Sequence, residues 1–168
     1  MSLTLIGGGA RSGKSWQALQ LARQCGGRLA FLATARPEDE EMRARIALHR
    51  SERGCEFTTL EEPLAVAGVI AAEAPRFDAI VVDCATLWLS NLMFAEADIE
   101  RECAKLLSVT ADVPARILLV TNEVGCGIVP ESPLARAFRD YAGRLNQQAA
   151  QAAEEVYWMV FGISLRVK

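Results

Sequence analysis

The chain has 168 residues, 51% of them hydrophobic and 23% charged, a composition that supports one folded domain and excludes an intrinsically disordered chain. Eighteen Lys and Arg residues against 21 Asp and Glu residues give a formal net charge of -3, which argues against a nucleic-acid backbone as the main partner. The five cysteines include no C-x-x-C pair and there is a single histidine, so the sequence argues against a zinc site and predicts reduced thiols in a cytoplasmic protein.

Five apolar runs of strand length alternate with segments of helical spacing along the chain. The strands are predicted at residues 3–6, 29–33, 79–83, 117–121 and 156–161, and the helices at residues 15–25, 37–53, 63–74, 99–107 and 133–155. Near-continuous apolar strands are typical of a parallel sheet that is covered on both faces. The pattern, without a linker or an internal repeat, predicts a single α/β domain over residues 1–168, built on a doubly wound, mostly parallel sheet.

Two features argue against a membrane location. Residues 1–7 lack the basic region and the long apolar region of a signal peptide. The longest apolar stretches, at residues 79–89 and 156–165, are interrupted by Asp83 or are shorter than the roughly 20 residues that a spanning helix needs. The sequence therefore predicts no membrane anchor.

A complete phosphate-binding pattern follows the first predicted strand. It matches G-x-x-x-x-G-K-[ST] with the residues Gly8, Gly9, Ala10, Arg11, Ser12, Gly13, Lys14 and Ser15. In such a loop, backbone N–H groups and the lysine hold phosphate oxygens, and the hydroxyl of the last residue binds Mg²⁺. An incidental glycine-rich turn is the alternative, but the strand–loop–helix context favours nucleotide binding.

Asp83 closes the predicted strand at residues 79–83, where a phosphate loop needs a carboxylate for the metal ion. Asp83 and Ser15 are therefore the candidate Mg²⁺ ligands. A strand-end turn residue is the alternative interpretation of Asp83.

The single histidine, His49, lies on the predicted helix at residues 37–53, where Arg45, His49 and Arg53 are four residues apart and share a face. Neighbouring guanidinium groups disfavour the imidazolium form, so His49 could act as a neutral nucleophile at phosphorus. A solvated basic face is the alternative, and the spacing alone favours it.

The ordered set of motifs closely resembles the bifunctional adenosylcobinamide kinase / adenosylcobinamide-phosphate guanylyltransferase family of cobalamin biosynthesis. The resemblance covers residues 8–168 and is carried by the phosphate loop, Ala33-Thr34-Ala35, Arg45-Ile46 with His49-Arg50, Glu61-Glu62-Pro63, Val82-Asp83-Cys84, residues 121–130 and residues 138–147. Residues 122–130, which include Asn-Glu-Val-Gly-x-Gly-Ile-Val-Pro, are far more specific than any phosphate loop. Members often carry two adjacent histidines, whereas this chain has Leu48-His49.

The resemblance implies a RecA-like P-loop NTPase fold, a trimer with sites between subunits, and two reactions. The first phosphorylates adenosylcobinamide with ATP or GTP, and the second transfers GMP from GTP to adenosylcobinamide phosphate through a GMP-histidine at His49, with Lys14 holding the phosphates. It also implies a guanine-nucleotide site that contains Ala33, Thr34, Ala35, Arg50, Ser51, Glu52, Arg53, Glu61 and Asp83. Glu61 suits the adjacent donors of guanine, although a helix N-terminal charge is an alternative interpretation.

Asn122 and Glu123 follow another strand, at the edge of the sheet where ligands gather in α/β folds, and are expected to contact substrate or phosphate. Trp88, Leu92, Met93 and Phe94 form an apolar cluster that could contact the corrinoid or another subunit, although core packing is the commoner meaning of such a cluster.

Two other functions share the phosphate loop: a monofunctional small-molecule kinase and a nucleotide-binding module that switches conformation without catalysis. Neither accounts for the motifs after residue 110.

Overall fold

The computed structural model describes residues 3–36, 40 and 53–168. The described strands form one seven-stranded sheet in the order β3-β2-β4-β5-β1-β6-β7. They are β1 (Leu3–Gly8), β2 (Leu29–Ala33), β3 (Phe57–Glu61), β4 (Ala79–Asp83), β5 (Arg116–Val120), β6 (Glu155–Val160) and β7 (Ile163–Arg166). All neighbouring pairs are parallel except β6 and β7, which form an antiparallel hairpin.

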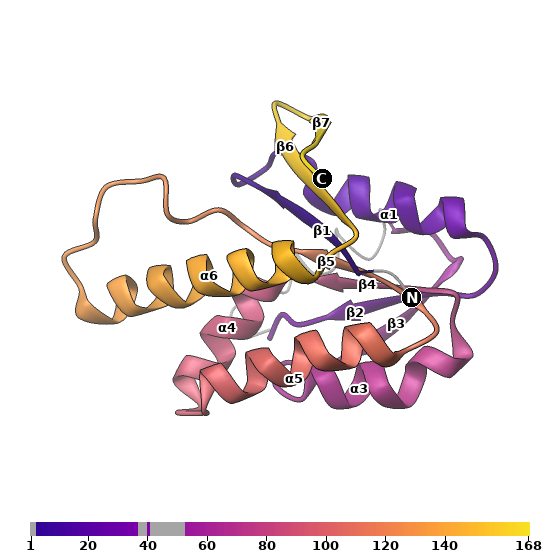
Figure 1. Cartoon of the computed structure of the whole chain (residues 1–168), viewed down its shortest axis with the longest axis horizontal. Coiled ribbons are helices and arrows are strands. Elements are labelled where there is room, and N and C mark those ends of the chain that lie inside the picture. The colour runs from indigo at the N-terminus through magenta and orange to yellow at the C-terminus, as the bar shows by residue number, and fades with distance from the viewer. Residues whose placement is uncertain (1–2, 37–39, 41–52) are drawn as a thin grey trace.

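The described helices are α1 (Lys14–Cys25), α3 (Val66–Glu73), α4 (Ala85–Phe94), α5 (Ile99–Asp112) and α6 (Pro133–Ala152), with a 3₁₀ turn at Ala74–Arg76. Helix α1 packs on one face of the sheet, and α3, α4, α5 and α6 pack on the other (Figure 1). The prediction of a doubly wound, mostly parallel α/β sheet is confirmed.

Side chains that alternate along the strands build the two cores. Leu5 and Ile80 face the helices α3 to α6, whereas Ile6 and Val81, the next residues along, face α1. Because successive side chains of a strand point to opposite faces, a strand buried on both sides must be apolar at nearly every position. This explains the uninterrupted apolar runs in the sequence.

Three elements differ from the prediction. Helix α4 was not predicted, because Ala85, Trp88, Leu89 and other residues on most of its sides are buried and leave no polar face to set a helical period. Strands β3 and β7 were also missed, since both are short and largely exposed and lack a long apolar run.

Helix boundaries shift by a few residues. The third predicted helix begins at Val66 instead of residue 63, because the Glu62 carboxylate accepts hydrogen bonds from the N–H groups of Leu64 and Ala65 at 2.8 and 2.9 Å and holds them in a turn. Helix α5 extends to Asp112, with Asp98 capping its start, and α6 ends at Ala152. The helix predicted at residues 37–53 lies outside the described residues, apart from Glu40 and Arg53.

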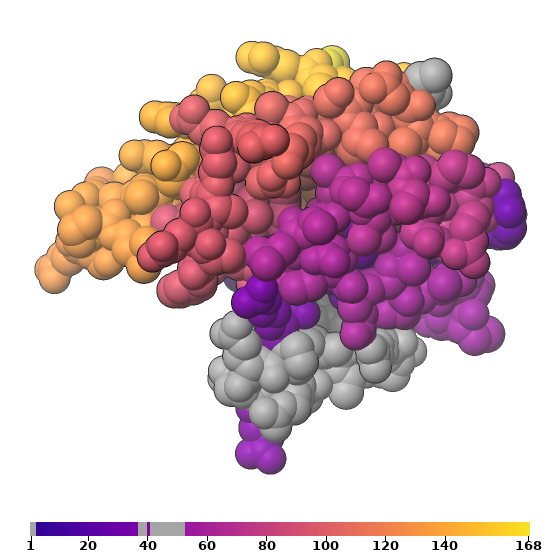
Figure 2. All heavy atoms as spheres, turned by 90° about the horizontal axis from the view of Figure 1, so that it is seen from below, coloured from indigo at the N-terminus to yellow at the C-terminus, as the bar shows by residue number. Residues whose placement is uncertain are grey.

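The N-terminal end of α6 extends beyond the rest of the described molecule, together with the loop that follows β5 (Figures 1 and 2). Ile128, Val129 and Leu134 in this region are 97%, 57% and 54% exposed. No helix of the described part of the chain has the length and apolarity needed to cross a membrane.

Candidate active site

The phosphate-binding sequence forms the connection between β1 and α1. Gly8 closes β1 with φ +150°, and a Cβ atom there would lie 2.7 Å from the carbonyl oxygen of Met159 on β6. Gly13 precedes α1 with φ +92°, in the left-handed region that favours glycine. The loop therefore requires glycine at both positions, one for a close approach and one for the turn into the helix.

Lys14 is the first residue of α1, and its side chain curls back into the loop. Its Nζ donates to the carbonyl oxygen of Gly9 at 2.5 Å, and the residue is 7% exposed. Burial lowers the pKa of Lys14, while the negative charge of Asp83 acts in the opposite direction. The loop thus holds a poorly hydrated cation, which is well suited to phosphate oxygens.

Asp83 ends β4, and only β5 separates this strand from β1. The carboxylate is close enough to influence the pKa of Lys14, as the sequence interpretation of Asp83 requires. Ser15 follows Lys14 in the first turn of α1, where it is half-buried. The structure therefore brings a hydroxyl, a carboxylate and an ammonium group to one end of the sheet.

Residues 33–35 lie beside Asp83 because Ala33 pairs with Asp83 in the register of β2 and β4. The Thr34 hydroxyl accepts from the N–H of Cys84 and donates to the carbonyl oxygen of Cys84, both at 2.9 Å. Asn91 of α4 donates to the Thr34 carbonyl oxygen at 2.8 Å. Thr34 is fully buried and supports the connection after Asp83.

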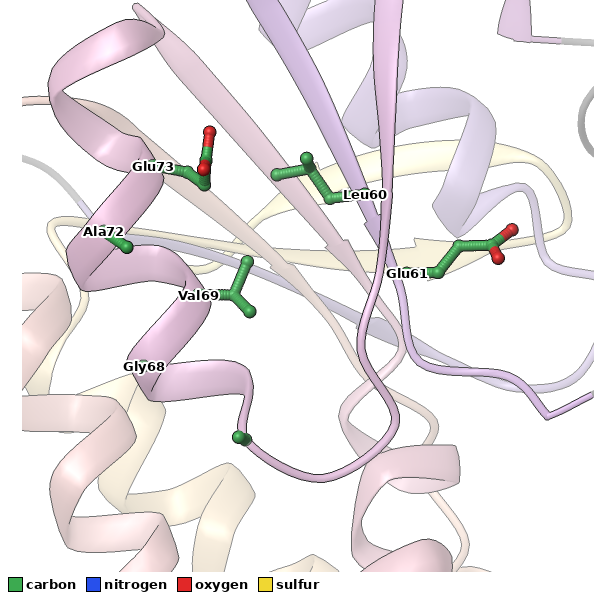
Figure 3. Close-up of a pocket in the computed structure, with 7 residues that line it drawn as sticks. Leu60, Glu61, Gly68, Val69, Ala72 and Glu73 are labelled. Carbon is green, nitrogen blue, oxygen red and sulfur yellow. The ribbon is translucent and has the colours of Figure 1, made fainter.

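Glu61 is in register with Ala33 on the edge strand β3, so it also lies at the carboxyl edge of the sheet. Leu60 points toward α3 and a groove of about 370 Å³, whereas the carboxylate of Glu61 points away from α3 (Figure 3). The groove is lined by Leu60, Glu61, Ala65, Gly68, Val69, Ala72 and Glu73. It is mainly apolar and does not contain the phosphate loop.

Asn122 and Glu123 continue β5 between the strands that carry the phosphate loop and Asp83. The Asn122 side-chain amide donates to the Thr86 hydroxyl at 2.7 Å. The Glu123 N–H donates to the carbonyl oxygen of Gly8 at 3.1 Å, which links this segment to the phosphate loop. The expected position of both residues is confirmed, but Asn122 is engaged within the protein.

Sequence reasoning missed a polar network behind this edge. Asn146 accepts from the Thr121 hydroxyl at 2.7 Å and donates to the Asn122 carbonyl oxygen at 3.3 Å, so α6 supports the end of β5. Thr86, which joins Asn122 to the start of α4, is 5% exposed. Asn146, a polar residue between the buried Leu145 and Ala149, was the available signal, but its partner could not be read from spacing.

Arg53 is 4% exposed, and its guanidinium carbon lies 3.8 Å from the centre of the Phe31 ring on β2. Its carbonyl oxygen accepts from Arg23 of α1 at 2.9 Å. Arg45, His49, Arg50, Ser51 and Glu52 lie outside the described residues, so the predicted arrangement around His49 stays a prediction.

The apolar cluster of α4 divides into two parts. Trp88 and Leu92 are 1% and 2% exposed and belong to the core, and the Trp88 indole N–H donates to the Leu64 carbonyl oxygen at 2.8 Å. Phe94 is 73% exposed and Met93 is half-buried. Core packing therefore accounts for the first two residues.

The fold is that of P-loop NTPases. The flagellar accessory protein FlaH from Methanocaldococcus jannaschii superposes with a TM-score of 0.56 at 15% identity, over 99% of this chain and 78% of FlaH. A KaiC-like protein, PH0186, from Pyrococcus horikoshii OT3 gives a TM-score of 0.52 at 14% identity, over 94% of this chain and 71% of that chain. At such identities the likeness establishes the fold alone.

Sequence comparison identifies the family. The bifunctional adenosylcobalamin biosynthesis protein CobP of Pseudomonas aeruginosa is 45% identical over 168 residues, covering 98% of this chain and 96% of the relative. The bifunctional adenosylcobalamin biosynthesis protein CobU of Salmonella typhimurium is 40% identical over 181 residues, covering 99% of both. The CobU family, described as cobinamide kinase / cobinamide phosphate guanyltransferase, matches residues 4–167. The chain therefore belongs to the cobinamide kinase / cobinamide phosphate guanyltransferase family of transferases.

Proposed function

We propose that this chain catalyses two successive transfers in the assembly of the cobalamin nucleotide loop. It phosphorylates the aminopropanol hydroxyl of adenosylcobinamide with ATP or GTP, and it then transfers GMP from GTP to that phosphate to give adenosylcobinamide-GDP. The observation that carries the proposal is the buried Lys14 in a complete phosphate loop, with Asp83 close by, in a chain that matches the family over residues 4–167.

The phosphate loop has a role in both transfers. In the kinase reaction, Lys14 and the loop N–H groups hold the β- and γ-phosphates while the γ-phosphoryl group leaves. In the guanylyl transfer, the same groups stabilise the departing pyrophosphate. One cationic cradle can therefore serve both half-reactions.

Ser15 and Asp83 are the proposed protein ligands of Mg²⁺. A hydroxyl and a carboxylate are hard oxygen donors, and Mg²⁺ at phosphate sites usually takes only one or two protein ligands besides phosphate oxygens and water. Their common position at the carboxyl end of β4 and the start of α1 fits this donor set. When bound, Mg²⁺ neutralises charge on the phosphate oxygens.

His49 is the proposed nucleophile of the guanylyl transfer. Its imidazole attacks the α-phosphorus of GTP, pyrophosphate leaves, and the GMP-histidine then delivers GMP to adenosylcobinamide phosphate. The proposed guanine-nucleotide site comprises Ala33, Thr34, Ala35, Arg50, Ser51, Glu52, Arg53, Glu61 and Asp83. The register that places Ala33 beside both Asp83 and Glu61 supports this grouping.

The proposal extends to a cytoplasmic homotrimer with sites between subunits and no nucleic-acid partner. Support for subunit contacts comes from the exposed apolar residues Ile128, Val129 and Leu134 on the projecting region of the molecule. The net charge of -3 supports a small-molecule substrate over a nucleic acid.

The test incubates the pure protein with Mg²⁺ and either α-labelled or γ-labelled GTP, without corrinoid, and resolves it on a denaturing gel. We expect retained α-label that is acid-labile, base-stable and absent from His49→Ala. A second incubation adds adenosylcobinamide, and its phosphorylation without any α-labelled protein in the first would identify a monofunctional kinase. GTP binding without either transfer would identify a switch module.

A further inference from the structure

Glu123 lies at the carboxyl end of β5, directly beside the phosphate loop. Strand β5 is the neighbour of β1, and the Glu123 N–H donates to the carbonyl oxygen of Gly8, the first residue of the phosphate loop, at 3.1 Å. The backbone of Glu123 is therefore fixed relative to the groups that hold the transferred phosphate.

The carboxylate of Glu123 is oriented by its own turn. Its Oε1 accepts from the Gly125 N–H at 2.8 Å, and Arg139 of α6 donates to the Gly125 carbonyl oxygen at 2.7 Å. Within the described part of the chain, Oε2 takes part in no hydrogen bond, and the residue is half-buried. Glu123 thus has one oxygen held in place and one oxygen available to a substrate.

The other polar side chains at the carboxyl edge of the sheet are less suited than Glu123 to contact a substrate beside the phosphate loop. The Asn122 amide is engaged with Thr86, and Asp83 is the proposed metal ligand. Glu61 is on β3, which β2, β4 and β5 separate from β1, or roughly 19 Å at about 4.8 Å per strand. Among the described carboxylates at the carboxyl edge, Glu123 is the one beside the phosphate loop that has no other assigned role.

We propose that Glu123 is the general base of the kinase half-reaction, an inference that rests on the proposed function. The substrate hydroxyl oxygen attacks the γ-phosphorus, and Glu123 Oε2 accepts the hydroxyl proton. The bond between the γ-phosphorus and the β–γ bridging oxygen breaks, and the nucleoside diphosphate leaves with the electron pair. The proton then passes from Glu123 to solvent, which regenerates the carboxylate.

The guanylyl transfer does not need a general base to deprotonate its acceptor. Its acceptor is a phosphate monoester, whose second pKa is about 6, so the attacking oxygen is already deprotonated near neutral pH. Loss of the Glu123 carboxylate should therefore separate the two activities of one protein. This separation distinguishes a base from a residue that merely supports the shared phosphate loop.

The experiment compares the wild type, Glu123→Gln and Glu131→Gln in two assays. One follows γ-label from ATP or GTP to adenosylcobinamide, and the other follows α-label from GTP to supplied adenosylcobinamide phosphate. Glutamine retains an oxygen for the Gly125 N–H, so the turn is preserved in Glu123→Gln. Glu131, which is exposed in the same loop, provides the matched loss of charge.

For Glu123→Gln we expect the kinase kcat to fall about 10²- to 10⁴-fold, the usual contribution of a general base, with little change in KM and an unchanged guanylyl transfer rate. Glu131→Gln should match the wild type in both assays. Two results would refute the role of Glu123 as general base and leave the proposed function intact. One is a kinase kcat in Glu123→Gln equal to that of the wild type, and the other is an equal fall of both activities. A wild type that phosphorylates no adenosylcobinamide overturns both.

Discussion

The Thr34 hydroxyl, just after β2, forms two hydrogen bonds with the backbone of Cys84, just after the neighbouring strand β4. It accepts from the Cys84 N–H and donates to the Cys84 carbonyl oxygen, each at 2.9 Å. Cys84 directly follows Asp83, so this bridge joins the ends of β2 and β4 beside the proposed metal ligand. Both partners are buried, which leaves water no access to replace the bonds.

Replacing Thr34 with valine should therefore destabilise the protein by about 2 kcal/mol, because the buried Cys84 N–H loses its acceptor while the side-chain shape is kept. The Cys84 carbonyl oxygen loses one of two donors and keeps the Trp88 N–H at 3.1 Å. Urea denaturation measures this change. Thr34→Ser, which retains the hydroxyl, should lose clearly less stability. Equal midpoints for Thr34→Val and the wild type would show that the bridge contributes nothing to folding.

Lys14→Met should reduce both half-reactions by about 10²-fold or more, because the cation that stabilises the phosphates is lost. The stability of the nucleotide-free protein at neutral pH should not fall, since burial already disfavours the Lys14 ammonium. Thermal denaturation with and without GTP measures both effects. The wild type should gain a rise in Tm from GTP that the variant lacks.

The same lysine predicts a pH dependence. Because the folded-state pKa of Lys14 lies below 10.5, the unfolded chain binds more protons between the two pKa values, so wild-type stability should rise with pH in that window relative to Lys14→Met. Urea midpoints of the two proteins over a series of alkaline pH values test the sign. If the stability of the wild type relative to Lys14→Met fell as the pH rose, the buried position of the Lys14 ammonium would be contradicted.

The thiols should divide into two classes. Cys25, Cys55 and Cys126 are exposed, whereas Cys84 and Cys103 are buried, so a thiol reagent should modify three cysteines in the native protein and five in guanidinium chloride. Rapid native modification of all five would show that the core opens around Cys84 and Cys103.

Alkaline pH should destabilise the protein through these buried thiols. Desolvation raises the pKa of Cys103 from 9.0 to about 11, so the unfolded chain releases its proton first and stability falls as pH rises above 9. By pH 11 the loss amounts to about 2 kcal/mol for this group. Cys103→Ala should lose less stability than the wild type between pH 9 and pH 11 in urea titrations.

Neighbouring glutamates should have separate roles. Glu61→Ala should weaken GTP binding about 10- to 100-fold relative to ATP, because its carboxylate is the proposed acceptor for the guanine donors. Glu62→Ala should instead cost about 1 kcal/mol of stability, because the N–H groups of Leu64 and Ala65 lose their acceptor. Calorimetric nucleotide titration and thermal denaturation of both variants distinguish the roles.

Features that depend on neighbouring residues could be predicted from the amino-acid sequence. The apolar runs predicted five of the strands, the phosphate-binding pattern predicted the strand–loop–helix unit of Gly8 to Ser15, and the ordered motifs identified the family. These features are local, because a glycine in a tight turn or a periodic apolar face can be recognised within a few residues of sequence.

The contacts between segments that are distant in the sequence became known from the folded structure. Strand order places β5 between the strands of the phosphate loop and Asp83, and this brings Glu123 to Gly8 and Asn122 to Thr86. The side chain of Asn146 reaches Thr121 only because α6 packs across the end of the same strand. Such contacts depend on which helices and strands pack their apolar faces together. The spacing of residues along one segment does not predict that packing.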